Sequence, residues 1–410
     1  MPQPELLLPA GDGEKLRTAL SFGADSVYIG GKEFSLRAYA GNFTLEEIQE
    51  GLSFARPLHK KVITAVNIIA HNNDLAAMPS YLERLAALQV DGLIISDLGV
   101  LRLAQKYASD LPITISTQAN VTNYETAAFY RELGAKRIVL ARELNIDEIA
   151  DIKMKTGIEI EVFVHGAMCV SYSGRCLLSH YMTGRSANLG ACAHPCRYRY
   201  SLVEEKRPDE YYPIDEDERG SYILNSRDLC LIEFIPQLIE AGVDAFKVEG
   251  RMKSPLYIAS VARVYRNAID TYLENKKAYT SEQLKTWMNE LRKTATRPFT
   301  NGFIEGESEL IQAINGEKMP GRDHFCGIVR NYRGEIQMAE VEQRANFGPG
   351  ENLELLLPDG STVDLDLQHL YDIDMQEIDR ARHPQQLVLL PLKQEIPPYS
   401  ILRRRMKYDQ

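Results

Sequence analysis

Four of the six cysteines in this chain lie close together, at Cys169, Cys176, Cys192 and Cys196. Six, fifteen and three residues separate them in turn. Thiols so close in sequence form disulfides, bind a metal ion or hold a cluster. A structural zinc site more often has two tight cysteine pairs, and only the last pair here is tight. A cysteine-only set with uneven spacing is more typical of an iron–sulfur cluster.

The composition of the chain argues against disulfides. The first residues lack the basic and then apolar pattern of a secretory signal, and no run approaches the roughly 18 apolar residues that cross a bilayer. We therefore expect a cytoplasmic protein, in which thiols stay reduced and clustered cysteines bind metal or do redox chemistry. The formal net charge of −10 gives no overall attraction to nucleic acid, so any RNA binding must depend on local basic patches.

Polar residues that could bind or activate a substrate recur after short apolar runs. The candidates for acid–base catalysis are His71, His165, Glu143 and Glu249. The candidates for substrate binding are Asn67, Gln118, Asn120, Arg142, Arg175, Lys247, Arg251 and Lys253. Arginine and lysine side chains bind carboxylates and phosphates, whereas the amides of asparagine and glutamine present hydrogen-bond donors and acceptors to the edge of a nucleobase. Glu143 and Glu249 could instead pair with the neighbouring arginines and only orient them.

These residues need a scaffold that brings them together. From residue 5 to about 275 the chain alternates between short apolar runs and amphipathic stretches. We predict eight strands, at Glu5–Leu8, Ser26–Ile29, Val62–Ile68, Gly92–Ser96, Ile113–Ser116, Arg137–Ala141, Glu159–Val164 and Ala245–Val248. The predicted helices are Gly13–Phe22, Thr44–His59, Leu75–Leu88, Gly99–Ser109, Asn123–Leu133, Ile146–Thr156, Leu229–Ala241 and Pro255–Asn275.

This α/β alternation is typical of a TIM-type (β/α)8 barrel, in which the C-terminal strand ends form the active-site mouth. A doubly wound open sheet is the alternative, but no Gly-x-Gly-x-x-Gly follows the first strand. We assign the TIM-like barrel to residues 1–300, with a cysteine-rich loop over 165–228, and a linker to 301–322. Short alternating strands then predict a small antiparallel β-barrel domain over residues 323–410. The cysteine loop and the polar residues should thus meet at one mouth.

Other chemistries are less well supported. Neither His-Glu-x-x-His nor a Gly-x-Ser-x-Gly elbow is present. Cys169 or Cys176 beside His165 could act as a nucleophile, but a single nucleophile leaves three clustered cysteines unexplained. Cys230 could be a spare ligand, and Cys326 is expected to be a small buried residue. Arginines and tyrosines alternate in the cysteine loop, as single-stranded RNA recognition requires, although an ordinary solvated surface has them too.

A long signature runs through the cysteine loop: Glu161-x-Phe163-x-x-Gly166-Ala167-Met168-Cys169-x4-Gly174-x-Cys176-x-Leu178-Ser179. Further matches are Asn225-Ser226-Arg227-Asp228-Leu229 and Lys247-Val248-Glu249-Gly250-Arg251. On these residues the chain resembles the collagenase-like "unknown-type" peptidase family. That family also includes proteins of tRNA uridine hydroxylation and of ubiquinone biosynthesis, and Cys192-x3-Cys196-Arg197 is most similar to the tRNA branch.

The resemblance implies an enzyme that hydroxylates the wobble uridine of tRNA at C5, without molecular oxygen and with prephenate as co-substrate. It implies a [4Fe–4S] cluster held by Cys169, Cys176, Cys192 and Cys196, and the anticodon loop of tRNA as the partner. A collagenase-like peptidase remains an alternative. So does a non-catalytic subunit of a hydroxylase, assembled with a paralogous partner or as a homo-oligomer.

Overall fold

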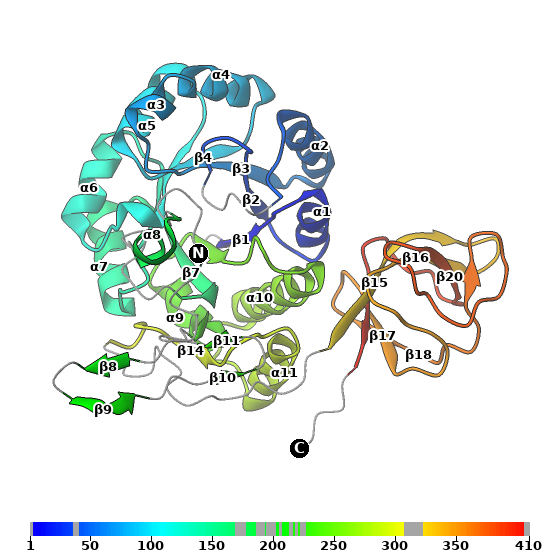
Figure 1. Cartoon of the computed structure of the whole chain (residues 1–410). Coiled ribbons are helices and arrows are strands. Elements are labelled where there is room, and N and C mark those ends of the chain that lie inside the picture. The colour runs from blue at the N-terminus through cyan, green and yellow to red at the C-terminus, as the bar shows by residue number, and fades with distance from the viewer. Residues whose placement is uncertain are drawn as a thin grey trace.

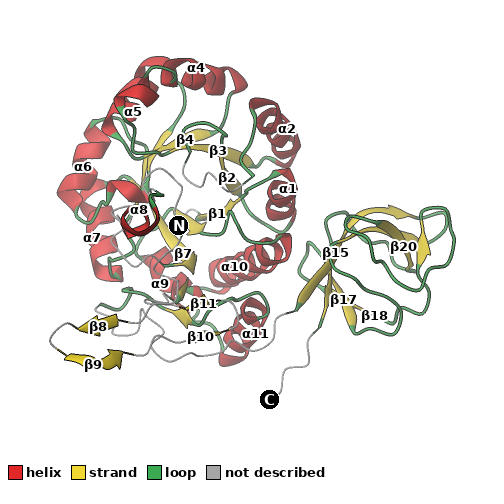
Figure 2. Cartoon of the chain, viewed as in Figure 1, coloured by secondary structure: helices red, strands yellow, loops and turns green. Residues whose placement is uncertain are grey.

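The structure is a computed structural model, and it describes residues 3–35, 41–168, 178–185, 193, 202–204, 207–212, 216–217, 220–221, 227–306 and 323–405. A parallel barrel surrounded by helices and a separate antiparallel sheet make up most of these residues (Figures 1 and 2). None of the helices in these ranges is both long enough and apolar enough to span a membrane.

The barrel has eight parallel strands, and the predicted TIM-type fold is confirmed. They are β1 (Glu5–Pro9), β2 (Ser26–Gly30), β3 (Lys61–Val66), β4 (Gly92–Ile95), β5 (Ile113–Ile115), β6 (Arg137–Val139), β7 (Glu159–Ala167) and β13 (Ala245–Val248). Each strand pairs with the next, and β13 pairs with both β1 and β7, which closes the barrel. The strands are rich in aliphatic residues because helices cover their outer face and side chains fill the interior.

Helices surround the barrel and bury their apolar faces against it. They are α1 (Gly13–Ser21), α2 (Leu45–Ala55), α3 (Asn72–Leu75), α4 (Met78–Leu88), α5 (Leu98–Tyr107), α6 (Tyr124–Glu132), α7 (Ile146–Thr156), α9 (Ile235–Glu240), α10 (Pro255–Asn275) and α11 (Ser281–Arg292). Side-chain caps mark where several of these helices begin. At the start of α1, for example, Asp12 accepts a hydrogen bond from the backbone N–H of Lys15. The sequence pattern did not predict α11.

Two predicted helices are interrupted by prolines. The predicted helix Thr44–His59 ends as an α-helix at Ala55, because Pro57 lies in a 3-10 turn that follows directly. In place of the predicted helix Leu75–Leu88, α3 ends at Leu75 and α4 begins at Met78. Pro79 lies in the first turn of α4, where a backbone N–H has no partner within the helix, so proline is tolerated there.

The predicted helix Leu229–Ala241 is wrong over its first part. Asp228–Cys230 form strand β12, and α9 begins only at Ile235. Strand β12 pairs antiparallel with β7 and parallel with β14 (Phe299–Thr300), so it adds to the sheet beside the barrel. Hydrogen bonding to two neighbouring strands outweighs the local helical pattern.

The segment between β7 and β12 contains short elements of its own. Helix α8 (Leu178–Thr183) follows the first two clustered cysteines. Further along, β8 (Leu202–Glu204) pairs with β9 (Arg207–Tyr212), and β10 (Glu216–Asp217) pairs with β11 (Gly220–Ser221).

Residues 323–405 form a seven-stranded antiparallel sheet, as predicted for the C-terminal β-domain. Its strands are β15 (His324–Arg333), β16 (Met338–Gln343), β17 (Leu353–Leu356), β18 (Thr362–Leu365), β19 (Tyr371–Asp372), β20 (Leu387–Pro391) and β21 (Ile401–Arg404). Strand β19 was not predicted. The sheet has its own buried core and lies beside α1 and α10 of the barrel (Figure 1).

Candidate functional site

The ends of β3 and β5 place the three predicted amides on the C-terminal rim of the barrel. Asn67 is buried after β3, and its carbonyl accepts a hydrogen bond from the Ser96 hydroxyl at 2.9 Å. Gln118 lies in a 3-10 turn after β5, which ends at Asn120 with a left-handed φ of 58°. The buried Oδ1 of Asn120 accepts no hydrogen bond from the part of the chain that the structure describes. These amides are placed to meet a ligand at the mouth.

Arg142 follows β6 and reaches across to β7. Its Nη1 donates a hydrogen bond to the carbonyl of Ala167 at 2.9 Å, and its guanidinium carbon lies 3.9 Å from the centre of the Phe163 ring. The aromatic ring attracts the cation, and the carbonyl fixes the direction of the guanidinium plane. Arg142 is therefore a fixed cation at the C-terminal end of β7. The adjacent Glu143 is half-buried, and its catalytic role stays a prediction.

Arg251 follows β13 and covers the end of β2. Its side chain is buried, and Nη1 donates a hydrogen bond to the Ser35 hydroxyl at 3.2 Å. A Cβ atom at Gly30 would lie 2.1 Å from the same nitrogen, so the guanidinium occupies the space that a side chain there would fill. Gly30 thus makes room for a second cation at the mouth. Glu249, also a candidate acid or base, is half-buried two residues before Arg251.

Lys247 lies inside the barrel, next to Phe163 of β7, and not on the rim. Its ammonium donates a hydrogen bond to Glu161 Oε1 at 2.7 Å and lies 4.5 Å from the centre of the Tyr28 ring. Burial lowers the pKa of Lys247, and the charge of Glu161 opposes this shift. Lys247 is therefore a buried cation below Arg142.

Lys253 points away from this group. The Lys253 ammonium donates a hydrogen bond to Thr296 at 3.0 Å and lies 3.6 Å from Asp228 Oδ2, so it points toward the added strands β12 and β14. Arg175 lies outside the described residues. For both residues, a role in substrate binding stays a prediction.

The two candidate histidines occupy very different places. His71 is exposed, and its backbone N–H donates a hydrogen bond to Asp74 at the start of α3. His165 is buried between β7 and α10, where its ring packs against Tyr257, Tyr265 and Phe299. Burial, and then the charge of Lys253, lower the pKa of His165 to about 3, so its ring is neutral at pH 7. An acid–base role for His165 stays a prediction, and its position favours packing.

The four clustered cysteines, Cys169, Cys176, Cys192 and Cys196, lie outside the described residues. One neighbouring contact is described: the Ser179 hydroxyl accepts a hydrogen bond from the backbone of Ala193 at 2.9 Å. Ser179 comes three positions after Cys176, and Ala193 directly follows Cys192. The contact thus joins the two halves of the cysteine segment. Elsewhere in the described chain, no group of three or more His, Cys, Asp or Glu residues is arranged to hold a metal ion.

The other two cysteines, Cys230 and Cys326, are buried. Cys230 lies in β12, where the Tyr265 hydroxyl approaches its sulfur at 3.9 Å. Burial raises the pKa of both Cys230 and Cys326 to about 11, so both are neutral thiols at pH 7. For Cys326 this agrees with the predicted small buried residue.

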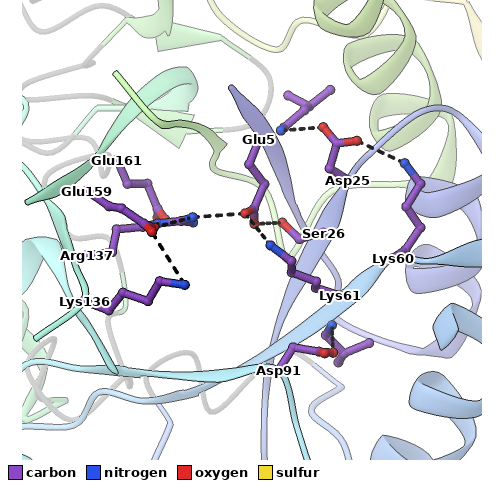
Figure 3. Close-up of polar contacts among 12 residues, drawn as sticks. Glu5, Asp25, Ser26, Lys60, Lys61, Asp91, Lys136, Arg137, Glu159 and Glu161 are labelled. Atoms are coloured by element: carbon purple, nitrogen blue, oxygen red, sulfur yellow. Dashed lines mark hydrogen bonds and ion pairs between the residues drawn. The ribbon is translucent and has the colours of Figure 1, made fainter. Parts of the chain in front are cut away.

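The sequence interpretation missed a chain of charged residues inside the barrel (Figure 3). Arg137, at the start of β6, donates hydrogen bonds to Glu159 and Glu5 at 3.0 Å and to Glu161 at 3.3 Å. Lys61 also contacts Glu5, at 3.1 Å. Burial raises the pKa of Glu5, but the charge and hydrogen bond of Arg137, the hydrogen bond from Ser26 and the charge of Lys61 together outweigh burial, and the pKa falls to about 2. Glutamates at alternate positions of a buried strand were the signal that could have revealed this chain.

Comparisons with known proteins find similarity along nearly the whole chain. A model of "Peptidase family U32" matches residues 11–313, and one of "Peptidase family U32 C-terminal domain" matches residues 322–403. The chain is 39% identical to tRNA hydroxylation protein P1 of Bacillus subtilis, over 98% of this chain and 95% of that protein. It is 34% identical to tRNA hydroxylation protein P of Escherichia coli, over 98% and 97%. It is also 30% identical to a protein named collagenase from Porphyromonas gingivalis, over 99% of both.

Proposed function

The chain belongs to peptidase family U32, and from this premise we propose that it hydroxylates RNA. The substrate is tRNA, and the product carries a hydroxyl group at C5 of the wobble uridine. The observation that carries this proposal is the similarity to tRNA hydroxylation proteins across both domains. Because tRNA is the substrate, we place the activity in the cytoplasm.

The arrangement of the mouth supports binding of two different ligands. Arg142 and Arg251 offer guanidinium groups that match carboxylates, which suits prephenate, a dicarboxylate, as the co-substrate. Asn67, Gln118 and Asn120 offer amides on the same rim, after β3 and β5, which suit the polar edge of uracil. The wobble base is already unpaired in the anticodon loop, so turning it into the mouth costs little stacking energy.

The cysteine set fits a [4Fe–4S] cluster, with Cys169, Cys176, Cys192 and Cys196 as the ligands. Four cysteine thiols are the donor set that such clusters use, and the Ser179–Ala193 hydrogen bond joins the two halves of the segment. When bound, the cluster supplies one-electron transfer. The residues of the rim bind and orient the two substrates.

The peptidase alternative has one observation in its favour, the relative named collagenase. Its chemistry finds little support in the described residues. The neutral, buried His165 is packed against three aromatic rings, so it is poorly placed to activate a thiol nucleophile.

Purified protein tests the proposal directly. The full chain is prepared without oxygen, its iron content and visible spectrum are recorded, and unmodified tRNA is incubated with it and prephenate. We expect about four iron atoms per chain, a visible absorption band and new 5-hydroxyuridine in the nucleoside digest. Cys176→Ser should lose iron and activity, whereas Cys326→Ala, which alters a buried thiol of the other domain, should keep both.

Two outcomes would favour the alternatives, and a third would change the co-substrate. A colourless, iron-free protein that cleaves gelatin identifies a peptidase. An iron-containing protein that modifies tRNA only after a paralogous protein is added identifies a partner subunit. Hydroxylation that proceeds equally well without prephenate removes that co-substrate from the proposal.

A further inference from the structure

We propose that Glu161 and Phe163, the first two residues of the cysteine-loop signature, are positioning residues for a pair of cations, Lys247 and Arg142. The pair binds the carboxylate groups of the co-substrate, and this part of the inference rests on the proposed function. Nothing in the sequence pattern alone assigned a role to Glu161 or Phe163, since both lie within an apolar strand.

Glu161 divides its two oxygens between two cations. Oε1 accepts a hydrogen bond from the Lys247 ammonium at 2.7 Å, and Oε2 accepts one from Arg137 Nη1 at 3.3 Å. Glu161 is 1% exposed, so a single carboxylate balances part of two buried positive charges. Arg137 is in turn held by Glu5 and Glu159, which fixes Glu161 from below (Figure 3). The ammonium of Lys247 is therefore fixed in position by a carboxylate that is itself held by a network of ion pairs.

Lys247 has hydrogen-bonding capacity left for a ligand. An ammonium has three N–H donors, and within the described residues only Glu161 accepts a hydrogen bond from it. Its other neighbours there are the faces of the Tyr28 and Phe163 rings, at 4.5 and 5.6 Å from their centres. A ring face attracts the charge but is a weaker acceptor than an oxygen atom. A carboxylate that enters the barrel from the mouth supplies the stronger acceptor.

Phe163 connects this buried cation with the one on the rim. The same ring contacts the Arg142 guanidinium at 3.9 Å and the Lys247 ammonium at 5.6 Å. The ring and Glu161 are two residues apart on β7, so both side chains point into the barrel. One strand thus sets the spacing of two cations, which a dicarboxylate can engage together.

The charged groups around Lys247 predict what happens when Glu161 is neutralised. Burial, Arg137 and Arg142 all lower the pKa of Lys247, and Glu161 raises it, while Tyr28 presents an uncharged ring. Without the Glu161 charge, the ammonium loses its proton at a lower pH. Binding of a carboxylate by Lys247 then weakens as the pH rises, because neutral lysine no longer attracts it.

The test compares Glu161→Gln with Glu159→Gln in the full chain. Both variants remove one carboxylate from Arg137, but only Glu161 touches Lys247. One readout is the pKa of Lys247, measured by NMR on protein with 15N-labelled lysine ammonium groups and assigned with Lys247→Met. The second is the dissociation constant of prephenate from pH 6 to pH 9, measured by calorimetry without turnover.

We expect the pKa of Lys247 to fall only in Glu161→Gln. Prephenate binding by that variant should weaken about tenfold or more between pH 6 and pH 9, equivalent to about 1.4 kcal/mol, while Glu159→Gln follows the wild type. A Lys247 pKa that is unchanged in Glu161→Gln overturns the inference. A lowered pKa without any prephenate binding by the wild type supports the positioning role and contradicts the proposed co-substrate.

A second variant covers the case in which Glu161→Gln does not fold. Glu161→Gln combined with Lys247→Met removes both charges and leaves no unpaired ion in the barrel. It should fold and bind tRNA but bind prephenate at least tenfold more weakly than Glu159→Gln. Prephenate affinity equal to that of Glu159→Gln overturns the role of the pair. Phe163→Leu should weaken prephenate binding without changing the iron content, and an unchanged affinity there removes Phe163 from the proposal.

Discussion

The barrel and the C-terminal domain each contain a buried arginine that is surrounded by three carboxylates. In the barrel, Arg137 contacts Glu5, Glu159 and Glu161. Between the domains, Arg403 of β21 contacts Glu354 and Asp323 of its own domain and Glu290 of α11 in the other. The composition is nearly the same in the two clusters. Their surroundings differ.

The Arg137 cluster continues toward the mouth, whereas the Arg403 cluster is closed. Glu161 contacts both Arg137 and Lys247, and the Lys247 ammonium faces aromatic rings. Around Arg403, the carboxylates bind further cations of the same interface, Lys293 and Arg405. Balanced ions at a closed interface hold two domains together. A series of ion pairs that ends at a cation with few hydrogen-bond acceptors can instead bind a ligand.

The same contrast holds for the C-terminal domain as a whole. Every arginine described there forms an ion pair with a carboxylate: Arg330, Arg333, Arg344, Arg380, Arg382, Arg403, Arg404 and Arg405. Phosphate binding requires cations whose charge is not already matched. We therefore expect phosphate groups to bind elsewhere than at these arginines, three of which, Arg330, Arg344 and Arg403, join the domain to outer helices of the barrel.

The largest effect expected is that of removing the central arginine of the closed cluster. Arg403→Met removes a fully buried cation that contacts the buried Glu354 and Asp323, and we expect a loss of about 3–5 kcal/mol in unfolding free energy. Urea unfolding followed by the fluorescence of Trp287, the one tryptophan of the chain and a residue of α11, measures this loss.

Two further variants test whether the loss of stability depends on burial and whether the two clusters differ in function. Arg404→Met, which breaks a partly exposed pair with Glu351, should cost less than about 1 kcal/mol. Arg137→Met should destabilise the barrel and also weaken prephenate binding, whereas Arg403→Met should leave binding unchanged. If Arg403→Met weakens binding as much as Arg137→Met does, the two clusters do not differ in function.

Acid should weaken both clusters in the same range of pH. Burial raises the pKa of Glu290, but the charges and hydrogen bonds of Arg403 and Lys293 together outweigh burial, and the pKa falls from 4.5 to about 2, as it does for Glu5 beside Arg137. A carboxyl whose pKa is lowered by folding stabilises the protein above its ordinary pKa. That contribution, on the order of 3 kcal/mol for each group, is lost as the pH falls from about 4.5 toward 2.

Single substitutions separate the two contributions to acid stability. Unfolding free energies of Glu290→Gln and Glu5→Gln, measured from pH 6 to pH 3, should each depend less on pH than those of the wild type. Glu282→Gln, in the exposed first turn of α11, should follow the wild-type curve. A wild-type slope in Glu5→Gln would show that the ion pairs of the barrel interior do not contribute to stability.

The sequence allowed the barrel to be predicted because its strands are separate apolar runs, each followed by an amphipathic helix. It also allowed Arg142 and Arg251 to be placed at the mouth, since each comes three residues after the end of a strand. The directions of His165 and Lys247 could not be predicted. The register of β7 and β13 shifts between Lys247 and Val248, so His165 turns toward α10. Such a shift depends on pairing between distant strands and leaves no local pattern.

The smallest effect expected concerns a third cluster, which joins the domains at a more exposed place. Glu14, in the first turn of α1, accepts hydrogen bonds from Arg330 and from Arg344, the latter at 2.6 Å. These side chains are 19–27% exposed, whereas that of Arg403 is fully buried. Glu14→Gln should therefore cost about 1 kcal/mol at low salt, and less at high salt, because solvent and ions screen the pair.

Urea unfolding of Glu14→Gln at two salt concentrations measures this difference. Glu46→Gln is the matched control, because it removes a carboxylate from the first turn of the neighbouring helix α2 without touching the C-terminal domain. Glu46→Gln accounts for the loss of a favourable charge at a helix N-terminus, and the remaining loss in Glu14→Gln belongs to the interface. If that remaining loss equals the effect of Arg403→Met, burial does not set the strength of these interdomain ion pairs.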